Sequence, residues 1–257
     1  MKILITGGNG YIAKSIHSYL YLKHDITLIT RNDFDLINKD ETVNWFKNKY
    51  FDVVIHTATT GGNRLLGENS NILFQNLKMY DNLETCRKHF NKFIHFGSGA
   101  EVNPTTYYGF GKHIINQLMK PNPKNLNIRI YAVFDENELD QRFIKSNIIR
   151  YINKEDIKIH QDKKMDFFYM KDLISMIEWF LNQRKNRFPV PVINCSYLEK
   201  YTLNQIANII NSLDEHKVNI VIENQEQGND YYGIHPIMPF KLVGLEEGIK
   251  EVYNILK

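Results

Sequence analysis

The sequence contains little cysteine. Its two cysteines, Cys86 and Cys195, lie far apart in apolar or helical surroundings and form no C-x-x-C motif. A disulfide framework or a cysteine-based metal site needs more cysteines at closer spacing. We therefore expect two buried thiols, no disulfide and no metal site.

The sequence also lacks long apolar runs and a strong charge of one sign. No apolar segment approaches the roughly 20 residues that cross a bilayer, and 32 Lys and Arg against 29 Asp and Glu give a net charge of +3. The basic residues are scattered, which argues against a nucleic-acid-binding surface. Because a strand-like segment begins at Lys2, no room is left for a signal peptide. We expect a cytoplasmic protein without a membrane partner.

What is present is a hydrophobic content of 43% in 257 residues, enough for one substantial core or a large domain with a small appendage. Strand-like segments alternate with helical ones, which predicts a doubly wound α/β fold whose parallel sheet binds ligands at the carboxyl ends of its strands. We expect strands at 2–6, 26–30, 53–57, 92–96, 127–134 and 192–195, an extended segment at 157–166, and helices at 40–50, 69–89, 172–183 (capped by Asp172) and 204–212.

A glycine turn follows the first expected strand. Gly7 would form the tight turn, Gly10 would let a pyrophosphate approach the backbone, and Ala13 would allow close packing between helix and strand. The helix beginning near Tyr11 would then direct its unpaired N–H groups at the phosphates. The alternative is an ordinary strand-turn-helix corner.

Tyr108 and Lys112 are four residues apart and project from one face of a helix. A phenol titrates near pH 10 in water, so it exchanges a proton at neutral pH only if its anion is stabilised. Lys112 would supply the stabilising charge. The alternative is an unrelated pair on a surface helix, which the glycine turn at the start of the chain disfavours.

These two motifs together resemble the extended short-chain dehydrogenase/reductase family of the NAD-dependent epimerase/dehydratase type, which acts on nucleotide-linked sugars. Within it, segment 30–36 and the Gly61-Gly62 loop look most like the 4-keto-6-deoxy-sugar reductases, including the GDP-fucose synthase and dTDP-4-dehydrorhamnose reductase branches. Further segments that resemble the family are 51–58, 93–98, 166–172 and 242–250.

The resemblance implies a division of the chain and an assembly. Residues 1–135, rejoined by 162–195, would form the dinucleotide-binding Rossmann domain, while 136–161 and 196–257 would form a smaller, interleaved sugar-nucleotide-binding part. Helices 69–89 and 108–119 resemble the pair through which family members dimerise as a four-helix bundle, so we expect a homodimer.

The cofactor depends on the end of the second strand. An acidic residue there would bind the ribose of NAD, whereas Arg31 can meet the 2′-phosphate of NADP. Asp33 and Asp35 keep NAD(H) open as the less favoured cofactor. Arg31 has the alternative of a solvated loop cation. The resemblance places Asp35 and Leu36 against the adenine. It gives further cofactor contacts to Gly7, Gly10, Tyr11, Ile12, Ala58 and Lys112.

By resemblance, Tyr108 would protonate a sugar carbonyl oxygen as a hydride arrives from the nicotinamide, with Lys112 bonded to the ribose as well. A second bond to that oxygen normally comes from a serine or threonine. Aligned on Val102, that position falls on Gly99, so we assign Ser98, one residue earlier, with Thr105 and Thr106 as alternatives.

The substrate contacts implied by the resemblance are Arg142, Asn76 and Lys164. The short spacing from Ser98 to Tyr108 indicates a trimmed loop, and Glu101 stands where the fucose-synthase branch has its proton-exchanging cysteine. We expect Glu101 to be a loop carboxylate that faces solvent, and the alternative is a base beside the sugar. No histidine aligns with that branch's second residue, and we expect the nearest candidate, His160, to be structural.

We therefore expect an NADPH-dependent reductase of a nucleotide-linked 4-keto-6-deoxy sugar. The alternatives are an epimerase or dehydratase that retains NAD, and a non-catalytic nucleotide-dependent sensor or scaffold.

Overall fold

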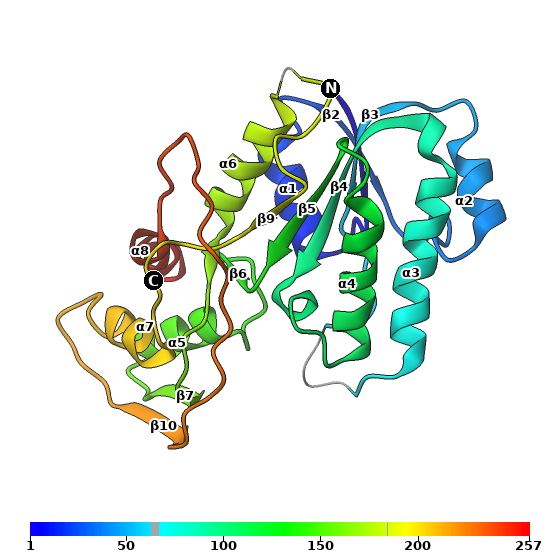
Figure 1. The fold of residues 1–257 in the computed structure, drawn as a ribbon. Helices are drawn as coiled ribbons and strands as arrows, with labels where there is room; N and C mark the ends of the chain where they lie inside the picture. The colour runs from blue at the N-terminus through cyan, green and yellow to red at the C-terminus, as the bar shows by residue number, and fades with distance from the viewer. Residues whose placement is uncertain (63–66, 184) are drawn as a thin grey trace. The chain divides into compact units, whose positions relative to one another are not determined.

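The computed structural model describes residues 1–62, 67–183 and 185–257 (Figure 1). The chain divides into two compact units. Unit 1 consists of Met1–Arg129 and Trp179–Ile193, and unit 2 of Ile130–Glu178 and Asn194–Lys257. The resemblance implies domain borders at 135, 161 and 195. These borders remain a prediction.

Unit 1 is built on the large sheet. Among the described residues this sheet has six strands in the order β2-β1-β3-β4-β5-β9, and β1 runs parallel to both β2 and β3, as does β3 to β4. The predicted doubly wound α/β fold is confirmed. The strands are β1 (Lys2–Thr6), β2 (Asp25–Ile29), β3 (Phe51–His56), β4 (Phe90–Ser98), β5 (Asn125–Ile130) and β9 (Val192–Asn194).

Helices cover both faces of this sheet because side chains alternate along each strand. Leu4, Val54 and Phe93 point to one face, where they share a core with residues of α2, α3 and α4. In Figure 1, α3 and α4 lie side by side. The helices are α1 (Tyr11–Leu20), α2 (Lys39–Phe46), α3 (Ser70–Thr85) and α4 (Tyr107–Met119), with short 3₁₀ turns η1 (Arg87–His89) and η2 (Gly99–Glu101).

The strand order reverses between β1 and β3, because β2 lies on one side of β1 and β3 on the other. In open parallel sheets the ligand lies beyond the carboxyl ends of the strands at such a switch point. Here those ends are Thr6 and His56, which lie side by side in the register of the two strands. The fold thus places the glycine turn after β1 at the expected ligand position.

Unit 2 has a separate core. Two short parallel strand pairs, β6 with β8 and β7 with β10, pack with three amphipathic helices around buried residues such as Phe134, Ile148 and Ile249. Its elements are β6 (Val133–Phe134), α5 (Phe143–Ile152), β7 (Ile157–Gln161), β8 (Phe168–Tyr169), α7 (Leu203–Ile210), β10 (Ile220–Asn224) and α8 (Leu245–Leu256). Helix α6 (Met170–Leu181) crosses the border between the units.

Two local expectations are wrong. The single strand expected at 127–134 divides after Ile130, and Val133–Phe134 pairs instead with β8 of unit 2. Asp172 does not cap α6, which begins at Met170. Its buried carboxylate instead accepts the N–H groups of Val243 and Gly244, at 2.7 and 3.0 Å, in the segment that leads into α8.

Both cysteines are buried, as predicted. Within the described ranges, no helix combines the length and the apolar composition needed to cross a membrane.

Candidate active site

The glycine turn after β1 has the geometry that a dinucleotide phosphate requires. Gly7 has φ +70°, and a Cβ on it would lie 2.8 Å from the backbone of Ala58. The N–H of Gly10 donates to the carbonyl of Gly7 at 2.8 Å, which closes the turn. Among the described residues no side chain caps α1, and its first turn contains no acidic residue. Its N–H groups thus remain a suitable cradle for a pyrophosphate.

The neighbouring cofactor positions predicted from the resemblance lie around this turn. Tyr11 and Ile12 are half-buried in the first turn of α1, and Ala13 is fully buried behind them. Ala58 donates its N–H to the Thr6 hydroxyl at 3.2 Å, which ties the end of β1 to the loop after β3. The structure thus brings Gly7, Gly10 and Ala58 together.

The loop after β2 holds its acidic side chains in internal hydrogen bonds. The Asp33 carboxylate accepts both the N–H (2.8 Å) and the hydroxyl (3.0 Å) of Thr30. Asp35 accepts the N–H of Ile37 at 3.0 Å, and Leu36 is buried in the core of unit 1. The Arg31 side chain is exposed. The loop therefore presents a cation while its nearest carboxylate is occupied.

Tyr108 and Lys112 lie on α4, whose start is capped by the Thr106 hydroxyl. The Lys112 ammonium is 3% exposed, donates to the carbonyl of Phe96 at 2.7 Å, and lies 5.6 Å from the centre of the Tyr108 ring. Burial lowers the pKa of Lys112 to about 8, and the Glu101 carboxylate opposes this shift. Lys112 therefore stays mostly protonated at pH 7 beside the phenol.

The Gly61-Gly62 loop lies against Tyr108. Gly62 has φ +80°, and a Cβ on it would come within 3.1 Å of the phenol ring. The Glu68 carboxylate accepts the N–H of Tyr108 at 2.9 Å. A side chain at position 62 would therefore crowd the phenol ring.

Ser98 ends β4 and begins the η2 turn. Its hydroxyl oxygen accepts the N–H of Ala100 at 3.2 Å, and the residue is buried. Both alternatives are exposed: Thr106 caps α4 by accepting the N–H of Gly109, and Thr105 precedes it in the chain. Ser98 therefore remains our prediction for the second hydrogen-bond donor.

The expectation that Glu101 faces solvent is wrong. Glu101 is 1% exposed, and its carboxylate binds Asn127 and Arg129 on β5 and the backbone of Ser98. No local sequence pattern links Glu101 to residues of the next strand, and only the adjacency of β4 and β5 brings them together. The glycine at 97 was the available signal, because a Cβ there would overlap the Glu101 carboxylate.

The predicted substrate residues belong to both units, Asn76 to unit 1 and Arg142 and Lys164 to unit 2. Asn76 is 2% exposed, and its amide binds the backbone of Thr60 in both directions as well as the Thr59 hydroxyl and the carbonyl of Ile72. It thereby holds the loop after β3. Arg142 and Lys164 are exposed side chains of unit 2. All three substrate contacts stay predictions.

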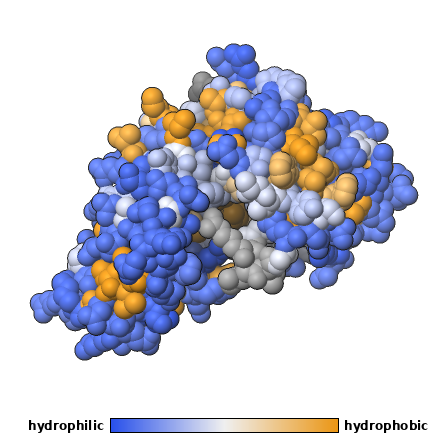
Figure 2. Space-filling model, turned by 60° about the horizontal axis from the view of Figure 1, so that its bottom comes forward, coloured by the Kyte–Doolittle hydropathy of each residue, from blue (hydrophilic) through white to orange (hydrophobic). Residues whose placement is uncertain are grey.

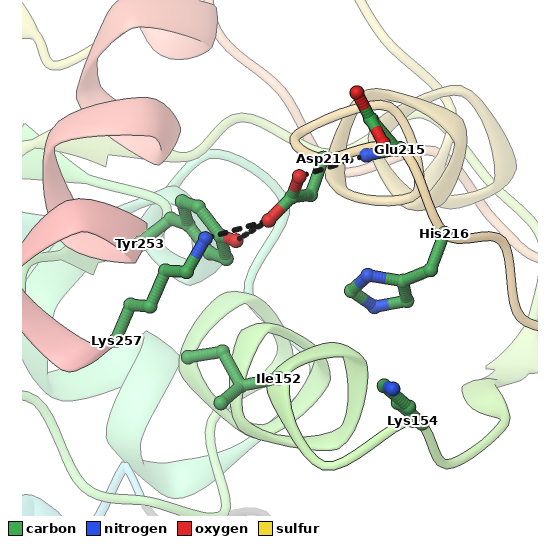
Figure 3. A pocket seen from close by; sticks show the side chains of 7 residues that line it. All are labelled: Ile152, Lys154, Asp214, Glu215, His216, Tyr253 and Lys257. Atoms are coloured by element: carbon green, nitrogen blue, oxygen red, sulfur yellow. Dashed lines mark hydrogen bonds and ion pairs between the residues drawn. The ribbon is translucent and has the colours of Figure 1, made fainter.

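His160, also in unit 2, is exposed on β7 and paired with Glu223 at 3.2 Å. Unit 2 also contains two cavities, of about 380 and 590 Å³. The smaller one is shown in Figure 3, where Asp214 binds Lys257 and Tyr253. Neither cavity is lined by a predicted catalytic residue. The predicted catalytic residues, Ser98, Tyr108 and Lys112, belong to unit 1.

Two histidines that the sequence reasoning did not single out lie beneath the site. His56 on β3 stacks on His95 on β4, and both are fully buried. Burial and the charge of Lys112 lower the pKa of His56 to about 3 and hold that of His95 well below its usual value. His56 contacts the Thr6 hydroxyl at 2.8 Å, while neither ring nitrogen of His95 has a hydrogen-bond partner among the described residues. Both rings are therefore neutral.

Comparison with known protein families identifies the family of this chain. The model of the NAD dependent epimerase/dehydratase family matches residues 3–196. The chain belongs to this family. Membership of the epimerase/dehydratase family was predicted from the glycine turn and the Tyr108–Lys112 pair, and it is confirmed, as is the prediction of an NAD(P)-dependent enzyme.

Individual members of the epimerase/dehydratase family are distant in sequence. The CDP-abequose synthase of Yersinia pseudotuberculosis is 21% identical, over 86% of this chain and 87% of its own length. A UDP-glucuronic acid 4-epimerase mutant from Bacillus cereus, solved with NAD, superposes with a TM-score of 0.80 at 18% identity, over 99% of this chain and 98% of its own. A GDP-L-fucose synthetase from Naegleria fowleri bound to NADP gives 0.74 at 17%, over 98% and 91%. These two structures confirm the fold.

The buried histidines predict an acid-sensitive unit 1. An unfolded histidine binds a proton below about pH 6.5, whereas folded His56 stays neutral to about pH 3. The stability that this neutrality contributes is therefore complete above pH 6.5 and is lost as the pH falls. We expect the free energy of unfolding in urea to drop by about 1 kcal/mol per histidine between pH 7 and 5.5.

The comparison variant is His95→Phe, whose slope of stability against pH should be about half as steep in that interval. His160→Gln, which changes an exposed histidine, should keep the parent slope. A parent protein with pH-independent stability between pH 7 and 5.5 would contradict the assignment of neutral buried rings.

Proposed function

We propose that this chain reduces the 4-keto group of a nucleotide-linked 4-keto-6-deoxy sugar with NADPH, in the cytoplasm, as a step of deoxysugar biosynthesis. The observation that carries the proposal is the buried Lys112 ammonium beside the Tyr108 phenol, on the unit whose glycine turn suits a dinucleotide. NADPH, when bound, supplies the hydride.

The residues of unit 1 then have distinct roles. Tyr108 donates its phenolic proton to the carbonyl oxygen of the sugar, and Lys112, mostly protonated at pH 7, stabilises the phenolate that remains. Ser98 donates a hydrogen bond to the same oxygen. These roles suit a reductase because α4 carries both a proton donor, Tyr108, and a cation that stabilises its anion, Lys112.

An NAD-retaining epimerase is the second candidate, favoured by the structural similarity to the UDP-glucuronic acid 4-epimerase. The loop after β2 supports the reductase instead. Its carboxylate at Asp33 is bound to Thr30, and its exposed Arg31 suits a 2′-phosphate. Exchangeable NADPH in the purified protein would agree with the reductase, and tightly retained NAD with the epimerase.

We predict that Tyr108→Phe loses reduction while keeping the cofactor. With CDP-, GDP- or dTDP-linked 4-keto sugars and NADPH, kcat should fall to below about a hundredth, because general acid catalysis is typically worth 10² to 10⁴. NADPH affinity, measured by fluorescence, should stay within about threefold. Tyr107→Phe changes the exposed neighbouring tyrosine and should match the parent. A Tyr108→Phe variant that keeps more than about a hundredth of the parent kcat would refute the role.

Arg31→Ala tests the cofactor preference. Loss of the charged hydrogen bond should weaken NADPH binding by about 1.5 to 3 kcal/mol, while the NADH affinity stays nearly unchanged. Arg31→Lys, which keeps the charge without the planar fork, should lie between the two. Equal losses for NADPH and NADH in titration calorimetry would show that Arg31 shapes the loop instead.

We further propose that the protein is a homodimer through α3 and α4. Phe110, Ile114 and Leu118 are spaced four residues apart on α4 and are 36 to 57% exposed, and Phe74 of α3 is 64% exposed. On the view in Figure 2, hydrophobic side chains gather in patches on a largely hydrophilic surface. A pair of such helices buries its apolar stripe against a second copy as a four-helix bundle.

Ile114→Glu places a charge in the centre of this stripe and is expected to give a monomer in light scattering at micromolar concentration, because an unpaired charge is costly to bury. Leu22→Glu changes a residue of unit 1 that is 83% exposed outside the stripe, and it should leave the parent mass unchanged. A monomeric parent would overturn the dimer proposal alone.

A further inference from the structure

The Glu101 carboxylate joins three elements beneath the site. It is completely buried and lies on η2, the turn that follows β4. One oxygen accepts the N–H of Ser98 at 3.1 Å, and the other accepts from the Asn127 amide and the Arg129 guanidinium of β5, each at 2.8 Å. The carboxylate therefore fixes the end of β4 to its neighbour in the sheet.

The same turn also contacts α4. His113 donates to the carbonyl of Glu101 at 2.9 Å. Gly109 packs so closely on this turn that a Cβ on it would lie 2.7 Å from the carbonyl of Ala100. A shift of the turn would therefore move both Ser98 and the helix that carries Tyr108 and Lys112.

Stability alone does not account for this arrangement. A buried ion pair is weak evidence for stability, because its desolvation cost is comparable to its Coulombic gain. What the pair supplies is a fixed position, since a misplacement of about 1 Å in a reacting group can cost about 10²-fold in rate.

We propose that Glu101 is a positioning residue, whose carboxylate, held by Arg129, sets the place of Ser98 and of the Tyr108–Lys112 helix for the reduction. This proposal rests on the proposed function, because the aligned groups are those of the reductase.

The charge of Glu101 also acts on Lys112. The titratable groups that face the ammonium are His56 from β3, His95 from β4, Tyr108 from its own helix and Glu101 from the turn. Both histidines are neutral. Glu101 raises the pKa of Lys112 against the effect of burial. Removing its charge should therefore lower the titration midpoint of the lysine.

The test compares Glu101→Gln with Glu84→Gln, which removes the carboxylate of another ion pair of unit 1, Glu84–Arg87 at 3.4 Å. Two quantities are measured on the full chain: kcat and KM for reduction, and the titration midpoint of Lys112 by NMR of ¹³C-labelled lysine, assigned with Lys112→Met. For Glu101→Gln we expect a loss of at least about tenfold in kcat, a KM for NADPH within about threefold, and a midpoint lower by about 0.5 to 1 pH unit.

The control Glu84→Gln should match the parent in all three quantities. A Glu101→Gln variant with parent kcat, or with an unshifted Lys112 midpoint, would overturn the proposal. If Glu101→Gln does not fold, Glu101→Asp keeps the charge with a shorter reach. It should then lose at least about fivefold in kcat at an unchanged midpoint, and parent kcat in this variant would equally overturn the proposal.

The titration needs no substrate, which separates the two proposals. A parent protein that reduces none of the keto sugars refutes the proposed function, while a shifted midpoint in Glu101→Gln still shows that Glu101 sets the environment of Lys112.

Discussion

The burial of the Lys112 ammonium is the constraint on which the site depends. A buried ammonium loses its hydration, and burial lowers its pKa to about 8. It remains charged at neutral pH because the carbonyl of Phe96 accepts a hydrogen bond from the ammonium at 2.7 Å and Glu101 contributes a negative charge. The groups at the carboxyl ends of β3 and β4 are therefore arranged around the Lys112 ammonium.

The same cation explains the state of its neighbours. Two stacked histidines beside an ammonium are tolerated only as neutral rings, and the pKa values of His56 and His95 are lowered accordingly. A second positive charge would raise the cost of burying Lys112. Because the His56 and His95 rings are neutral, Lys112 supplies the positive charge at this position.

Sequence reasoning identified the parts of the fold that depend on short-range patterns. The glycine turn, the start of α1 at Tyr11 and the Tyr108–Lys112 helix follow from the residues within about two turns of each position. The contacts that it missed join positions far apart in the chain. Glu101 reaches Arg129 only because β5 lies beside β4, and Asp172 binds Val243 only because α8 begins next to α6. Such partners leave no periodic signal in the sequence.

The position of Glu101 narrows the chemistry available to the site. An epimerase or dehydratase that removes a carbon-bound proton needs a base facing its substrate. Both oxygens of Glu101 are instead committed to the N–H of Ser98 and to the donors of β5, and its side chain is fully buried. A carboxylate bound in this way joins the end of β4 to β5 in the interior of unit 1. The turn therefore gives no support to abstraction of a carbon-bound proton by Glu101, whereas the reduction that we propose needs no such base.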